Sequence, residues 1–241
     1  MKYAVIADIH SNREALESVI EAASVRKVQH FYCLGDLVGY GADPGWCLKT
    51  IREVAVKTVQ GNHDAAVGEP GELVKLNPDA RQAVIWTASQ LTLAEIDYLQ
   101  SLPLVEEEEG ISLVHSSFEF PQNWDYIFTP EDARTSLRRL SGPLGFCGHT
   151  HRPGFFRLRG EEVSLVLGDR IRLQPGDRVL VNPGSVGQPR DRDPRAAFAV
   201  GDRKEGTVEI VRVNYSVEEA QRKIRTAGFP NFLADRLAEG R

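Results

Sequence analysis

The side chains best suited to chemistry in this sequence stand at the ends of five short apolar runs, each of strand length. The metal-capable residues at these ends are Asp8 and His10, Asp36, Asn62-His63-Asp64, His115, and His149 and His151. Of the six histidines, only His30 lies outside these groups. Because ligands of open α/β sheets gather outside the carboxyl ends of the strands, we expect the five ends to converge on one crevice.

The spacing within the groups supports a shared site. Asp8 and His10 are two residues apart, as are His149 and His151, so in an extended chain both members of each pair point to the same side. Glycine stands directly before Asp36 and before two further groups, where a missing Cβ lets the backbone bend sharply. The pattern therefore predicts a site built at the ends of several strands.

The donor set is typical of a transition-metal site. It contains two carboxylates, one amide and four candidate imidazole ligands, with no thiolate. Such ligands suit Mn²⁺, Fe, Zn²⁺, Co²⁺ or Ni²⁺, and the set is too rich in histidine for Ca²⁺ or Mg²⁺ alone. Two ions about 3.5–4 Å apart that share one carboxylate would clamp the attacking and leaving oxygens of a phosphoryl transfer. We expect two divalent or trivalent metal ions as cofactors, with Mn first among the candidates.

The elements that must position these groups change character along the chain. The first half alternates apolar runs at 3–7, 31–34 and 56–60 with helical patterns at 44–54, 78–90 and 93–102. The second half is rich in short strand-like runs, and its tail reads as one or two helices broken at 228–230. This order predicts one α/β domain over 1–241, a four-layer α/β/β/α sandwich of two mixed sheets flanked by helices. A C-terminal helical tail starts at about residue 217.

The composition excludes several classes of protein. The chain has 241 residues and a formal net charge of −5, which argues against a nucleic-acid coat protein, since such proteins carry a basic excess. No apolar run approaches the roughly 18 residues of a membrane span, and the N-terminal apolar stretch is too short for a signal peptide. Three cysteines without a CxxC pair indicate neither a disulfide framework nor a zinc knuckle. We expect a cytoplasmic protein.

The five groups resemble, in order, the motif blocks of the calcineurin-like metallophosphoesterase superfamily. The blocks read Asp8-x-His10, Gly35-Asp36, Gly61-Asn62-His63-Asp64, His115 and Gly148-His149-x-His151. The resemblance implies that one metal is held by Asp8, His10, Asp36 and His151. It implies that the other is held by Asp36, Asn62, His115 and His149, with Asp36 as the bridge.

The same resemblance implies the catalytic roles. His63 would be the histidine that protonates the leaving oxygen, with Asp64 orienting its imidazole, while a hydroxide that bridges the metals attacks phosphorus in line. Residues 35–41 and 182–186 resemble the small prokaryotic branch, which includes small-molecule phosphodiesterases and dinucleoside polyphosphate hydrolases. The implied function is cleavage of a small phosphodiester or (di)nucleoside polyphosphate, with a small phosphate ester or nucleotide as the partner.

Two other functions stay open at this point. A protein Ser/Thr phosphatase is disfavoured, because that group has Asp-Arg-Gly where this chain has Gly39-Tyr40-Gly41. A non-catalytic scaffold of the same fold is disfavoured because such proteins have lost the catalytic histidine, whereas His63 is present here. The tail after Val217 can pack on its own sheet or on a neighbouring copy, so a homo-oligomer is also an alternative.

Substrate contacts are the least determined part of the site. Asn62 and Arg190 are candidates, Arg190 for a second phosphate of a polyphosphate, although a solvated loop explains Arg190, Arg192 and Arg195 equally well. Asn12 is either a substrate contact or a helix cap, and caps are commoner. We expect specificity to lie in loops such as 65–77 and 116–130.

Overall fold

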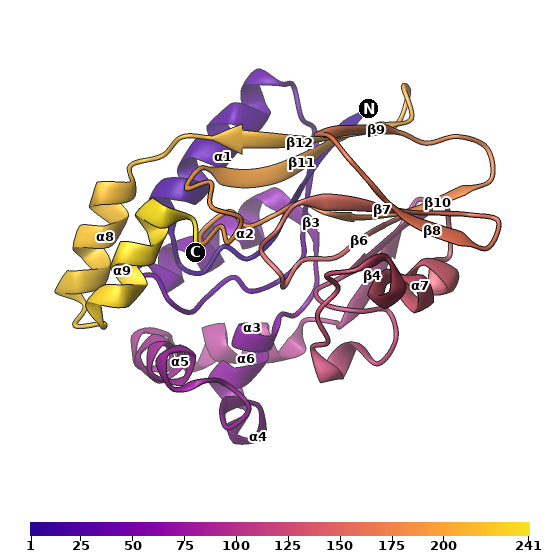
Figure 1. Ribbon diagram of the computed structural model, residues 1–241. Coiled ribbons are helices and arrows are strands. Elements are labelled where there is room, and N and C mark those ends of the chain that lie inside the picture. Colours follow the sequence, from indigo (N-terminus) through magenta and orange to yellow (C-terminus); the bar gives the residue numbers. More distant parts are fainter.

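The computed structural model describes residues 1–241 and arranges the strands in two six-stranded mixed sheets (Figure 1). The first sheet contains, from edge to edge, β3 (Ala55–Thr58), β2 (His30–Cys33), β1 (Lys2–Ile6), β11 (Ala196–Asp202), β12 (Thr207–Val213) and β9 (Arg170–Arg172). The second contains β4 (Val105–Glu108), β5 (Ile111–Val114), β6 (Leu144–Phe146), β10 (Asp177–Asn182), β7 (Gly154–Arg159) and β8 (Glu162–Val166).

Parallel pairing brings the important strand ends together. β1, β2 and β3 run parallel in the first sheet, and β5, β6 and β10 run parallel in the second. Each set therefore places its carboxyl ends along one edge of its sheet. The chain segments that leave these ends carry the metal-capable residues.

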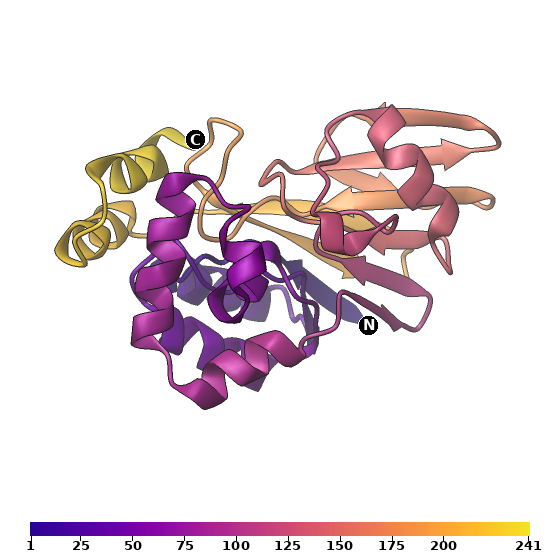
Figure 2. The ribbon, with the colours of Figure 1, turned by 90° about the horizontal axis from the view of Figure 1, so that it is seen from below.

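Helices cover the outer faces of both sheets (Figures 1 and 2). α1 (Arg13–Val25) and α2 (Pro44–Val54) pack on the first sheet, and α7 (Pro130–Arg139) packs on the second. The predicted four-layer sandwich is confirmed. The remaining elements are α3 (Asn62–Gly68), α4 (Pro70–Leu73), α5 (Pro78–Gln90), α6 (Leu93–Ser101), the 3₁₀ helix η1 (Pro121–Asn123), α8 (Val217–Thr226) and α9 (Asn231–Glu239). None of these helices combines the length and apolar character needed to cross a bilayer.

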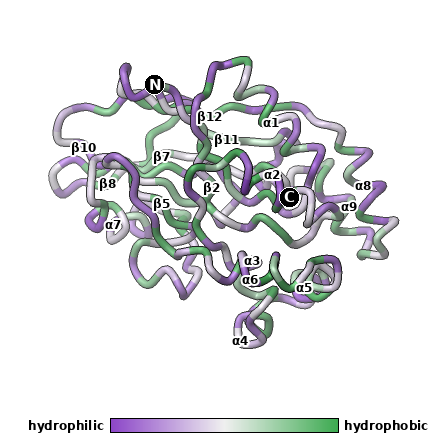
Figure 3. Tube along the Cα trace, turned by 180° about the vertical axis from the view of Figure 1, so that it is seen from behind, coloured by the Kyte–Doolittle hydropathy of each residue, from purple (hydrophilic) through white to green (hydrophobic).

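Alternation along the strands explains why two sheets pack face to face. In β1, Ala4 and Ile6 join the apolar cluster under the helices, whereas Tyr3 and Val5 join the cluster between the sheets. A strand that is apolar on both faces must be covered on both faces. Figure 3 shows hydrophobic residues alternating with hydrophilic ones along both strands and helices. Burying one large side chain there, such as Phe146, contributes about 1.5–3 kcal/mol.

The C-terminal hairpin of α8 and α9 packs on its own chain. Leu233 and Leu237 of α9 share an apolar cluster with Ala80 and Ala83 of α5. Lys223 of α8 forms ion pairs of 2.5 Å and 2.7 Å with Glu14 and Asp43. The hairpin is thereby fixed beside α1 and α5, at one end of the molecule in Figure 1.

The segment from 65 to 77 differs from the expected loop. α3 begins at Asn62 and continues through Gly68, and α4 follows directly. The two helices are seven and four residues long, too short for a helical period to show in the sequence. The second expected loop, 116–130, contains one 3₁₀ turn, η1.

Candidate metal centre and active site

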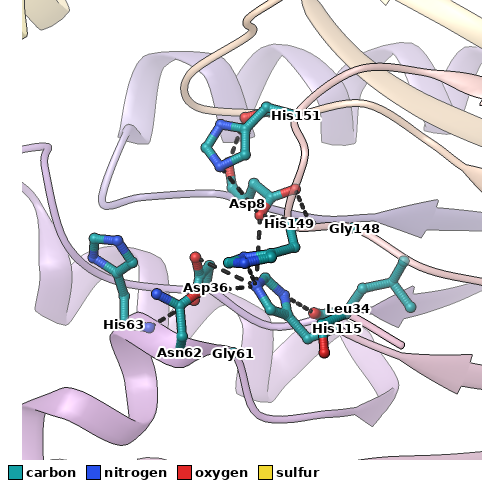
Figure 4. A network of polar contacts seen from close by, with 12 residues as sticks. Asp8, Leu34, Asp36, Gly61, Asn62, His63, His115, Gly148, His149 and His151 are labelled. Atoms are coloured by element: carbon teal, nitrogen blue, oxygen red, sulfur yellow. Dashed lines mark hydrogen bonds and ion pairs between the residues drawn. The ribbon is translucent and has the colours of Figure 1, made fainter. Parts of the chain in front are cut away.

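The seven candidate metal ligands come together in one buried region. All of them except His10 are labelled in Figure 4. Asp8, His10, Asp36 and His151 form one group whose ligand atoms lie within 4.8 Å of one another, and Asp36, His115 and His149 form a second. Asn62 joins the second group, with its Oδ1 at 3.3 Å from Nε2 of His115. Asp36 is the only residue common to both groups, which is the position of a bridging ligand.

Main-chain carbonyls determine which nitrogen of each imidazole faces the site. Nδ1 donates to Val38 O in His10 (3.1 Å), to Leu34 O in His115 (2.7 Å) and to Gln188 O in His151 (2.7 Å). A carbonyl oxygen only accepts, so Nδ1 carries the proton and Nε2 presents its lone pair to the centre. Hydrogen bonds to the ring nitrogen that faces away from the metal orient histidine ligands of metals in general.

The imidazole nitrogens that point into the site face each other in two pairs. Nε2 of His10 lies 3.2 Å from Nε2 of His151, and Nε2 of His115 lies 3.1 Å from Nδ1 of His149. With Nδ1 protonated, the nitrogens of the first pair have no proton to share. Burial lowers the pKa of all four rings, that of His115 to about 4, so they are neutral at physiological pH. Neutral nitrogen donors that converge at this distance fit a cation between them.

Asp36 lies between the two groups. Its Oδ2 is 3.5 Å from Nε2 of His10 and 3.5 Å from Nε2 of His115, while its Oδ1 accepts a 2.9 Å hydrogen bond from the amide of His63. Gly61 packs so tightly that an added Cβ would overlap Oδ1. Burial raises the pKa of Asp36 to about 7 in the absence of a cation.

Asp8 is held by the second sheet. The amide of His149 donates to both carboxylate oxygens of Asp8, at 3.3 Å and 3.2 Å, and Oδ1 lies 3.4 Å from Nε2 of His151. Burial, together with the nearby charge of Asp36, raises the pKa of Asp8 well above its usual value. Two carboxylates buried this close repel each other unless a positive charge lies between them.

The extended geometry expected for the paired ligands is wrong. Five ligands adopt left-handed backbone angles instead: φ is 53° at Asp8, 48° at His10, 52° at Asp36, 67° at His149 and 58° at His151. Such conformations cost about 1–3 kcal/mol each outside glycine and persist where the surrounding structure requires them. The ligands converge because the chain turns sharply at each strand end, rather than through the period-two alternation of a strand.

Asp64 does not orient His63 as expected. Its carboxylate accepts hydrogen bonds from the amides of Leu37 (2.9 Å) and Gly61 (3.1 Å), so it fastens two metal-binding loops to each other. The buried Nδ1 of His63 has no hydrogen-bond partner. Asp64 does not reach His63 because α3 starts at Asn62, and this start directs the Asp64 carboxylate toward main-chain amides that have no partner within the helix.

The remaining candidates for substrate contacts lie in different places, and only one of them lines the cavity at the metal site. Asn12 caps α1, accepting from Ala15 N at 3.1 Å and donating to Gly187 O at 2.9 Å, and it does not line the metal-site cavity. Arg195 forms a two-pronged ion pair with Asp193. Arg190 lines the cavity, and its guanidinium donates hydrogen bonds only to the neutral Gln188 side chain, lies over the ring of Tyr40 and forms no ion pair.

A cavity of about 340 Å³ opens onto the metal site. Its walls bring together Asn62, His63 and Arg190 with residues that sequence reasoning missed: Tyr40, Lys75, Trp124 and Tyr126. The ring of Tyr126 stacks on the imidazole of His149, with centroids 4.1 Å apart. The indole of Trp124 donates to Glu72 at 2.9 Å, which joins the 116–130 segment to α4. Tyr40 lies in the 35–41 motif, and the other three lie in the segments 65–77 and 116–130, but no sequence signal identifies these residues individually, since only the fold brings them to the cavity.

Two further residues position the metal loops. Asn182 donates to Gly148 O at 2.7 Å and to Thr150 Oγ1 at 2.9 Å. Ser185 donates to the carbonyl of Asp8 at 2.8 Å. The Asn-Pro-Gly-Ser-Val segment that resembles the small prokaryotic branch thus supports the ligands from outside.

Comparison with known proteins agrees with this site. Residues 1–206 match the profile of the calcineurin-like phosphoesterase superfamily domain. An uncharacterised protein of Methanocaldococcus jannaschii, MJ0912, is 38% identical over 99% of this chain and 98% of its own length. The crystal structure of a metallophosphoesterase from Sphaerobacter thermophilus is 36% identical, covers 100% of this chain and 99% of its own, and has a TM-score of 0.87.

A second structure, that of the hypothetical protein PH1004 from Pyrococcus horikoshii, shares the fold at 20% identity. Its TM-score is 0.79, with 100% of this chain and 98% of the other covered. The matched residues include every ligand group and His63, at positions 8 to 151. The chain belongs to the calcineurin-like phosphoesterase superfamily and is a hydrolase of this metal-dependent family.

Proposed function

We propose that this chain is a phosphohydrolase with two metal ions that cleaves a small phosphodiester or a (di)nucleoside polyphosphate. The facing imidazole nitrogens, with His10 against His151 and His115 against His149, are the observation that carries the proposal. Each pair supplies neutral donors for one ion, and Asp36 supplies a carboxylate oxygen that both ions can share. Nitrogen and oxygen donors in this ratio suit manganese, and also iron, zinc, cobalt or nickel.

The residues present fit such a pair of ions. Asp8, His10, Asp36 and His151 would hold one ion; Asp36, Asn62, His115 and His149 would hold the other. Bound there, two cations lower the pKa of water and neutralise the oxygens of a phosphate. The positive charges also offset the repulsion between the buried carboxylates.

Arg190 and the cavity favour a small anionic substrate. A volume of about 340 Å³ lies in the size range of small-molecule sites. The guanidinium of Arg190 has no acidic partner, so it is free to pair with a phosphate beyond the one at the metals. Lys75 lines the same cavity, although Glu72 neutralises it through a 2.7 Å ion pair.

His63 is the group that would supply a proton to the leaving oxygen. Its ring lines the cavity beside Asn62 and Arg190 but belongs to neither ligand group. Burial and the positive charge of Arg190 lower the pKa of His63 to about 3, so the ring is neutral without substrate. A bound phosphate brings negative charge to Arg190 and to the ring, and both effects favour the protonated imidazole.

Metal content tests the assignment of ligands. We expect about two ions per chain in the wild type, about one in His149→Ala and in His151→Ala, and the greatest loss in Asp36→Asn, because that carboxylate serves both ions. Metal analysis after dialysis measures this. His30→Ala removes the histidine outside the site and should leave the content unchanged. Equal metal content in Asp36→Asn and wild type would contradict the bridging role.

The contribution of Asp36 to the stability of the metal-free protein should fall as the pH rises. Burial raises the pKa of Asp36 to about 7, above the unfolded value of about 3.9, so between these two values the folded carboxyl holds a proton that the unfolded one has lost. The buried histidines act in the opposite direction, because their lowered pKa makes the unfolded chain the better proton binder below about pH 6.5. Thermal melting of Asp36→Asn beside the wild type, both with EDTA, isolates the carboxyl: the Tm of the variant relative to that of the wild type should be higher at about pH 8 than at about pH 5. Added Mn²⁺ should raise the wild-type Tm most at the higher pH. A Tm difference between the two proteins that does not change with pH would refute this account.

The catalytic role of His63 is tested with an alkyl ester of adenosine monophosphate and Mn²⁺-loaded enzyme. His63→Ala should lower kcat by about 10²–10⁴, because the alkoxide must then leave without a proton. Metal content should stay at the wild-type level, since His63 is in neither ligand group. Unchanged turnover would remove His63 from the mechanism.

Arg190 is tested with diadenosine tetraphosphate, whose asymmetric cleavage gives ATP and AMP. Arg190→Ala should raise KM for the tetraphosphate about 10–100-fold, the value of one charged hydrogen-bonded contact, and raise KM for a simple diester far less. The exposed Arg192→Ala, which does not line the cavity, is the control. Equal effects on both substrates would contradict a second phosphate subsite.

A further inference from the structure

Tyr40 is a cavity residue that the catalytic scheme above leaves without a role. Its side chain is 6% exposed, and its backbone adopts a left-handed φ of 55°, which is strained for a bulky residue. The amide of the next residue, Gly41, donates to the carbonyl of His10 at 3.0 Å. Tyr40 is therefore held at a fixed distance from the metal ligands, in a conformation that costs about 1–3 kcal/mol.

The inner side of the Tyr40 ring packs on two imidazoles. Its centroid lies 4.6 Å from that of His63 and 4.8 Å from that of His10, and the two histidine rings are themselves 4.8 Å apart. Three rings thus form a contiguous cluster. One of them is a metal-ligand candidate, one is the proposed proton donor, and the third is Tyr40.

No polar contact fixes the ring of His63. Its buried Nδ1 has no hydrogen-bond partner, and Asp64 is engaged with main-chain amides. Gly39 leaves just enough space for the imidazole, because an added Cβ would overlap Nδ1. The orientation of His63 therefore depends on packing, and Tyr40 supplies a large, rigid surface for it.

The outer side of Tyr40 is clamped by helices. Tyr40 belongs to the apolar cluster that α5 forms with α8 and α9, together with Ala83, Leu233 and Leu237. Gly240, at the end of α9, accepts a 2.8 Å hydrogen bond from the amide of Arg192 and so anchors the loop that carries Arg190. The hairpin, which follows the 1–206 segment matched by the family profile, supports both sides of the cavity.

We propose that Tyr40, held by the α8–α9 hairpin, is a positioning residue that fixes the imidazole of His63 for proton donation to the leaving oxygen. The inference rests on the proposed role of His63. In that step an oxygen that comes from water forms a bond to phosphorus and the P–O bond to the leaving group breaks. The electron pair of the broken bond goes to the leaving oxygen, and the proton of the imidazolium moves to that oxygen. A ring free to rotate would spend less time aligned for this transfer.

Leaving-group dependence separates positioning from general damage to the fold. A nitrophenolate leaves readily without a proton, whereas an alkoxide does not. Tyr40→Leu should lower kcat roughly 10–100-fold for the alkyl ester of adenosine monophosphate and about twofold or less for the nitrophenyl ester, with KM nearly unchanged. Tyr40→Phe keeps the ring and should restore most of kcat on the alkyl ester.

Two controls make the experiment decisive. Phe229→Leu trims the same apolar cluster at a residue that packs on Trp86, and should show no dependence on the leaving group. Tyr40→Leu introduced into His63→Ala should cause no further loss that depends on the leaving group, because any effect through His10 or Arg190, which Tyr40 also contacts, falls on both esters alike. If Tyr40→Leu does not fold, Tyr40→Met fills similar volume with a flexible side chain and should show the same pattern.

The outcomes distinguish this inference from the proposed function. An equal loss on both esters in Tyr40→Leu, or a further loss confined to the alkyl ester in the double variant, would overturn the positioning role. Loss of alkyl-ester turnover in His63→Ala with normal turnover in Tyr40→Leu would leave the proposed function intact and refute this inference alone. Full activity of His63→Ala would refute both.

Discussion

Burial of acidic and basic groups in one small volume is the constraint on which the rest of the structure depends. Two carboxylates and four imidazoles lie together in a region that excludes water. Asp8 and Asp36 raise each other's cost of ionisation, and the imidazole lone pairs meet without a proton between them. A positive charge at the centre removes both conflicts at once. The site is thus unfavourable as protein alone and is complementary to metal.

The sandwich supplies the rigidity that such a site needs. Parallel strands in each sheet end at the same edge, so ligands far apart in sequence are brought together by strands already fixed in the core. Main-chain carbonyls then choose the tautomer of three imidazoles, as Leu34 does for His115. Ser185 and Asn182 hold the loops from behind. The left-handed turns at the ligands persist because all these contacts act together.

The substrate side is built from different parts of the chain. α3 and α4, the segment around Trp124 and the loop that carries Arg190 form the cavity walls, while the α8–α9 hairpin supports them through Tyr40. The metal ligands come from strand ends and the cavity walls from connecting segments. The site of the candidate ligands and the walls of the cavity are thus built by different parts of the same fold.

The sequence by itself determined the ligand groups, the single proton-donor candidate and the layered fold, because strand alternation and short motifs are local properties. The tertiary structure decided which atoms of those residues face the site and which partners their side chains bind. It assigned Asp64 to main-chain amides instead of His63, and Asn12 to a helix cap. It also singled out Arg190, brought Tyr40 against His63, and replaced extended ligand pairs with left-handed turns. In each case a side chain could bind or contact several partners that are distant in sequence. Which partner it takes is decided only in the folded chain, where those partners come within reach.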